Sequence, residues 1–142
     1  MRSFIVIFLL LVPFFGSAQD FKKELKEANK MFKSQEYVEA QKKYKKLLDI
    51  KPADADLAYK YGACVVMTSP DNEQALKYLK HAEKSGKSDK EIAFFMGKAY
   101  ENNKDYANAI VYYERFAKVA DKEQLKNLKV KKCIKSCKKM LK

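Results

Sequence analysis

The chain has 142 residues, enough for one domain of ordinary size. Apolar residues make up 47% of it, including nine Phe and nine Tyr, which excludes a chain too polar to bury a core. Lys and Arg outnumber Asp and Glu by 30 to 18, giving a formal net charge of +12, and the few Gly and Pro residues favour helix almost throughout.

The N-terminal segment has the pattern of a secretory signal peptide. Arg2 supplies a positive start, residues 4–15 form an apolar run, and the small residues 16–18 precede a predicted cleavage after Ala18. An uncleaved membrane anchor is the alternative, but the run is shorter than the roughly 20 residues of a spanning helix. We therefore expect residues 1–18 to be a signal peptide and the protein to be exported to the periplasm or cell envelope, with at most peripheral membrane association.

Export changes how charge and cysteine content are interpreted. A basic domain suggests nucleic acid, but outside the cytoplasm we expect no nucleic-acid partner. Disulfides persist in such compartments, and the three cysteines, Cys64, Cys133 and Cys137, leave at least one thiol unpaired or intermolecular.

Hydrophobic periodicity and helix-end signals predict seven helices joined by short loops. Asp20 and Asp54 are predicted N-caps, Ser88 and Asp121 open capping-box sequences, and Gly86 is expected to stop a helix. The expected helices span about 21–33, 37–49, 55–68, 72–84, 91–100, 106–120 and 122–141.

A repeat of 34 to 35 residues is the strongest signal in the chain. Small residues recur at this interval, and so do large residues after them, as close packing of two helices requires. The four series are Ala28/Gly62/Gly97, Ala40/Ala75/Ala109, Tyr44/Leu79/Tyr113 and Leu47/Ala82/Phe116. Paired helices at this period are typical of helical-repeat arrays.

These features resemble the tetratricopeptide repeat (TPR) family. Tyr37 to Ala40 and Tyr106 to Ala109 match the family's aromatic–x–x–Ala start of a second helix, and Pro52 matches its closing Pro, whereas Asn72 stands where an aromatic is expected. The resemblance implies an all-α, right-handed α-solenoid of three TPR helical hairpins plus a C-terminal capping helix. The implied TPR domain is 19–142, with repeats at about 21–54, 55–89 and 90–120 and the capping helix at about 122–141.

The resemblance also implies where a ligand would bind. The first helix of each hairpin lines the concave face, which in the family takes an extended or helical peptide. The chaperone-binding carboxylate clamp is not expected, because Leu25, Glu91 and Phe95 occupy places where it needs polar or basic groups. The predicted groove residues are Leu25, Asn29, Phe32, Tyr59, Ala63, Met67, Phe94, Lys98 and Glu101.

No residue set for catalysis is visible, so we expect no enzyme, no cofactor and no catalytic residue. The single His81 lies in an amphipathic helix, and there is no Ser–His–acid set, glycine-rich loop or HExxH. Cys133 and Cys137, four residues apart, could hold a metal ion, form a local disulfide or pack as buried thiols, and the last is favoured.

The C-terminal helix combines an apolar stripe, Val130, Ile134, Cys137 and Leu141, with many lysines. This pattern fits either a solvated capping helix or a basic face that docks a partner. The favoured function is a non-enzymatic protein–protein interaction scaffold of the cell envelope that binds a peptide, a protein surface or an envelope complex; exported arrays of this kind resemble those of Bacteroidetes envelope proteins. The alternatives are a basic adaptor for lipid headgroups, lipopolysaccharide or acidic protein, and a structural subunit of an envelope complex.

Overall fold

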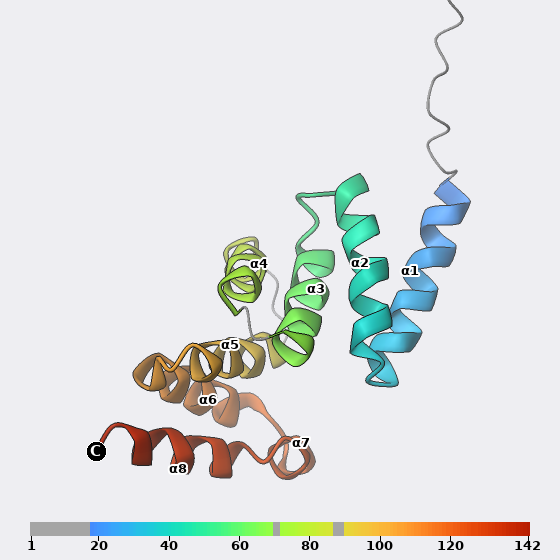
Figure 1. Cartoon of the computed structure of the whole chain (residues 1–142). Helices are drawn as coiled ribbons and strands as arrows, with labels where there is room; N and C mark the ends of the chain where they lie inside the picture. Colours follow the sequence, from blue (N-terminus) through green and yellow to red (C-terminus); the bar gives the residue numbers. More distant parts are fainter. Residues whose placement is uncertain (1–17, 70–71, 87–89) are drawn as a thin grey trace, which may run out of the picture.

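The computed structural model describes residues 18–69, 72–86 and 90–142, and all regular structure in these ranges is helical (Figure 1). Nothing in the described ranges forms a helix with the length and apolarity to cross a membrane. All of the predicted signal peptide except Ala18 lies outside the described residues. The helices are α1 (Ala18–Lys33), α2 (Tyr37–Ile50), α3 (Ala55–Thr68), α4 (Asn72–Lys84), α5 (Glu91–Asn102), α6 (Tyr106–Val119), α7 (Lys122–Asn127) and α8 (Val130–Met140).

The helices stack as consecutive hairpins. Helix α1 pairs with α2, α3 with α4, and α5 with α6, while α2 contacts α3, α4 contacts α5 and α6 contacts α8. In Figure 1 the helix axes turn along the stack, from upright in α1 and α2 to nearly horizontal in α5, α6 and α8. This arrangement is the all-α solenoid that the repeat predicted.

Small residues allow the close approach inside two hairpins. A Cβ on Gly97 would lie 2.8 Å from the Cδ1 atom of Tyr113, and a Cβ on Gly62 would lie 2.9 Å from the Cγ atom of Leu79. Both distances are below normal carbon–carbon contact. The repeat series therefore reflects helix–helix packing, as predicted.

The large residues of the repeat series form the continuous core. Tyr44, Leu79, Tyr113 and Phe116 are all fully buried. Asn72, which replaces the expected aromatic, is also buried and accepts a hydrogen bond from the Asn102 side chain of α5 over 3.1 Å. A polar link between hairpins thus takes the place of an aromatic contact.

Three of the five predicted helix-end signals are confirmed. The Asp54 carboxylate accepts hydrogen bonds from the backbone N–H groups of Asp56 and Leu57, and Asp121 forms the predicted capping box. Gly86, with φ of 78°, follows the end of α4. Asp20 was predicted wrongly as an N-cap: α1 begins at Ala18, and Asp20 lies in its first turn, where its charge complements the helix dipole. Ser88 lies outside the described residues.

The predicted C-terminal capping helix is two helices instead of one. Lys129 adopts a left-handed conformation, with φ of 51°, between α7 and α8. In one straight helix Leu128 and Val130 would point about 200° apart. The break lets Leu128 contact the core while Val130 is fully buried. Leu141, predicted to lie in the buried stripe, follows the end of α8 and is exposed.

Candidate functional site

The middle of the predicted groove is filled by aromatic side chains. The Phe32 ring of α1 lies with its centroid 6.3 Å from that of Tyr59 in α3 and 6.4 Å from that of Phe95 in α5. Tyr59 is only 2% exposed and Ala63 is fully buried. These two residues therefore belong to the core and not to an open groove surface, because α1, α3 and α5 approach closely enough for their rings to meet.

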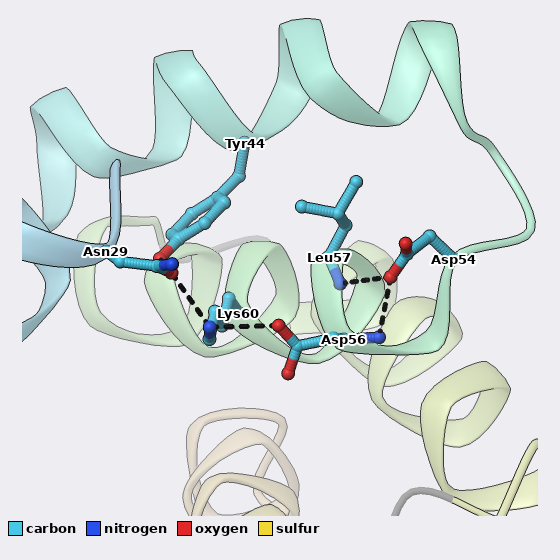
Figure 2. Close-up of polar contacts among 6 residues, drawn as sticks. All are labelled: Asn29, Tyr44, Asp54, Asp56, Leu57 and Lys60. Atoms are coloured by element: carbon cyan, nitrogen blue, oxygen red, sulfur yellow. Dashed lines mark hydrogen bonds and ion pairs between the residues drawn. The ribbon is translucent and has the colours of Figure 1, made fainter. Parts of the chain in front are cut away.

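Asn29 serves to join helices. Its side-chain oxygen accepts hydrogen bonds from the Tyr44 hydroxyl of α2, at 2.9 Å, and from the Lys60 ammonium of α3, at 2.8 Å (Figure 2). Lys60 also forms an ion pair with Asp56 over 2.9 Å. This network fixes the first hairpin against the second. Leu25, which lies on α1 with Asn29, is partly buried and packs against the core.

Leu25 and Asn29 line a hollow of about 870 Å³ along α1. A separate pocket lies between α5 and the α7–α8 segment. Its volume is about 400 Å³, within the usual range for ligand sites. Of the nine predicted groove residues, four line it: Met67, Phe94, Lys98 and Glu101. The other lining residues are Tyr37, Phe95, Asn127, Leu128, Lys129, Lys132, Cys133 and Ser136.

The pocket has an apolar floor and a basic rim. Phe94 and Phe95 are 6% and 5% exposed, so little of either ring reaches the floor, whereas Met67 is 43% exposed. Lys129 and Lys132 are exposed on the α8 side. Such a site suits an apolar anchor flanked by acidic or polar groups.

Glu101, the acidic residue of the lining, is already engaged. The buried Tyr113 hydroxyl donates a hydrogen bond to its carboxylate over 2.5 Å, and the Lys98 ammonium lies 3.9 Å from the same oxygen. Burial, together with the Glu101 charge, raises the pKa of Tyr113 well above its usual range, so the phenol stays protonated and remains a donor. Glu101 is thereby held to the pocket wall.

The three cysteines, Cys64, Cys133 and Cys137, form no disulfide. Burial, reinforced by the Glu101 charge, raises the pKa of Cys137 to about 11, and the same two causes raise the pKa of Cys133. Burial raises the pKa of Cys64 to about 12. Reactive cysteines need the opposite shift. Cys137 is buried and Cys133 packs partly buried against the core, in line with the packing role that the sequence favoured for these two residues. Within the described ranges no three His, Cys, Asp or Glu residues are placed to hold a metal ion.

Sequence reasoning missed the α7–α8 wall of the pocket. The repeat itself contained part of the signal: adding 34 residues to Phe94 gives Leu128, and adding 34 to Lys98 gives Lys132. Helix α8 thus occupies the place of the first helix of a fourth hairpin. Treating it only as a cap hid its contribution to the concave face.

Neither a protein-family model nor a curated protein matches the sequence. Solved structures do match. The Yersinia enterocolitica type III secretion chaperone SycD, in complex with a peptide of the translocator YopD, is similar with a TM-score of 0.67 and 16% identity, over 89% of this chain and 98% of that one. The Sgt2 TPR domain from Aspergillus fumigatus is similar with a TM-score of 0.63 and 20% identity, over 86% of this chain and 79% of that domain. The chain therefore has the fold of TPR helical-repeat proteins.

Proposed function

We propose that this protein is a non-enzymatic interaction module that captures a peptide, or an exposed segment of a protein, on its concave side. The single observation that carries this is the α5–α8 pocket, where an apolar floor lies beside exposed lysines. The SycD structure with a bound peptide supports the same use of a similar fold.

The chemistry around the pocket supports binding over catalysis. The two thiols that pack beside Glu101 have raised pKa values, and the carboxylate is held by Tyr113. A nucleophile or base needs a group whose pKa is tuned towards neutrality. The residues of this site instead offer contact area and charge.

We place the protein in the cell envelope, as an exported protein of the kind seen in Bacteroidetes. The signal-peptide pattern of residues 1–18 supports this location. Intact-mass measurement of protein recovered from the periplasm tests it: a chain beginning at Gln19 is expected, and a chain that retains residues 1–18 in the cytoplasm would contradict it.

Peptide selection followed by pocket blocking tests the binding function. Random twelve-residue peptides are displayed on phage and selected on the protein, and the affinities of the selected peptides are measured by fluorescence anisotropy. Ser136 is exposed and lines the pocket, so Ser136→Trp should fill the space and weaken binding at least tenfold.

The matched control places the same ring elsewhere. Ala107 is exposed on α6 and does not line the pocket, so Ala107→Trp should leave affinity unchanged. Equal affinities for both variants and the parent protein would show that peptides do not bind between α5 and α8.

A further inference from the structure

The charge of the molecule is concentrated beside the pocket. Residues 122–142 contain nine lysines and one acidic residue, Glu123, so this segment contributes +8 of the chain's +12. Within the described part of the chain, Lys138 is the lysine of this segment that forms an ion pair, with Glu114 over 3.0 Å. The other lysines of α8 therefore remain available to a partner.

The basic surface is continuous with the pocket. A second hollow of about 470 Å³ runs along α8 and shares Lys132 and Ser136 with the α5–α8 pocket. Its remaining lining residues are Lys135, Lys138, Lys139 and Lys142. A chain that leaves the pocket past Ser136 would thus lie along a track of ammonium groups.

From these observations we propose that the partner segment is acidic: one large apolar side chain enters the α5–α8 pocket, and the Asp or Glu residues beside it lie along α8. This inference rests on the proposed binding function and specifies its ligand class. The 11 residues of α8 span about 16 Å, which matches about five residues of extended peptide. The acidic stretch is accordingly short.

The charges around the pocket favour an acidic partner over a basic one. Lys98, Lys129 and Lys132 surround the pocket, while its acidic residue Glu101 is held by Tyr113 and Lys98. A basic peptide would face this surplus of positive charge, and like-charge contacts oppose binding. An acidic peptide gains attraction that is screened by salt.

Two synthetic peptides of twelve residues test the proposal by fluorescence anisotropy. Both carry fluorescein and a Phe-Leu pair; one has four glutamates after the pair, and the other has glutamines. The glutamate peptide should bind at least tenfold more tightly, and its affinity should fall between about 50 and about 500 mM salt.

Charge reversal identifies the surface that binds. Lys135→Glu with Lys139→Glu should weaken binding of the glutamate peptide at least tenfold and change the affinity for the glutamine peptide by no more than about twofold. Lys42→Glu with Lys46→Glu is the matched control, because it changes net charge equally at exposed positions of α2, and it should leave both peptides unaffected.

The outcomes separate this inference from the proposed function. If both peptides bind equally and Ser136→Trp weakens both, the pocket binds peptides but the acidic preference is wrong. If Ser136→Trp changes the affinity for neither peptide, the peptides do not bind in the pocket and the proposed function is wrong. Binding of the glutamate peptide that ignores Ser136→Trp and is displaced by phosphatidylglycerol vesicles would overturn the inference in favour of an anionic membrane surface, and absence of glutamate-peptide binding would also overturn it.

Discussion

Replacement of Gly97 by Ala should destabilise the protein, although Ala is the better helix former. Gly97 lies in α5 opposite Tyr113, and a Cβ there would be 2.8, 2.9 and 3.1 Å from three ring carbons. The ring cannot move away easily: Tyr113 is fully buried, its hydroxyl is bonded to Glu101, and its centroid lies 5.9 Å from that of Phe94. The helices themselves must therefore separate.

The expected size follows from two opposing effects. Overpacking a tight core costs about 1–3 kcal/mol, whereas Gly→Ala in a helix interior gains about 0.5–1 kcal/mol. The net loss in free energy of unfolding should lie between about 0 and about 2.5 kcal/mol, with about 1 kcal/mol expected. Urea denaturation followed by far-UV circular dichroism measures it, with an unchanged m-value expected because the fold is retained.

Removing the ring should abolish the destabilisation. In a Tyr113→Ala background the three close contacts disappear, so Gly97→Ala should become neutral or stabilising. An osmolyte such as TMAO keeps the weakened background folded during the comparison. If Gly97→Ala stabilises the parent protein, or destabilises both backgrounds equally, the close contact between α5 and α6 does not limit this position.

Three further predictions concern helix ends, ion pairs and pH. Asp54→Ala should cost about 1 kcal/mol in urea denaturation, because two backbone N–H groups of α3 lose their acceptor; a value near zero would contradict the cap. Lys43→Met should cost up to about 1 kcal/mol at low salt and less at high salt, because Lys43 forms two ion pairs with α1; no salt dependence would argue against them. Thermal melting should show stability falling above about pH 9. The pKa values of Cys64 and Cys137 are about 12 and 11 in the fold and about 9 in the unfolded chain, so the unfolded chain releases these protons first. Cys64→Ala with Cys137→Ala should reduce the loss of stability per pH unit.

The repeat and the helix ends could be predicted from sequence because their causes are local. A helix needs its cap within a few residues, as at Asp54 and Asp121, and a hairpin needs its small and large residues at fixed spacing, as at Gly97 and Tyr113. These signals gave most helix bounds and the stacking order. The prediction of Asp20 as a cap was wrong because α1 begins at Ala18, before the first residue of the hydrophobic periodicity.

The open surface could not be predicted in the same way, because it depends on how the hairpins turn against one another. Phe32 and Phe95 meet across the concave side, although the sequence alone places them in different hairpins. Both rings also lie against Tyr59, so aromatic side chains fill the middle of the concave side, and the α5–α8 pocket lies beyond them.

The sequence by itself determined an all-helical chain of hairpins with a basic C-terminal segment, since composition, period and capping act over short distances. The tertiary structure decided that this segment breaks at Lys129, that α8 takes the place of the next first helix, and that Lys132 and Ser136 complete the pocket. The physical reason is that burial of Leu128 and Val130 is settled by packing against the hairpins before them, and no local pattern encodes that contact.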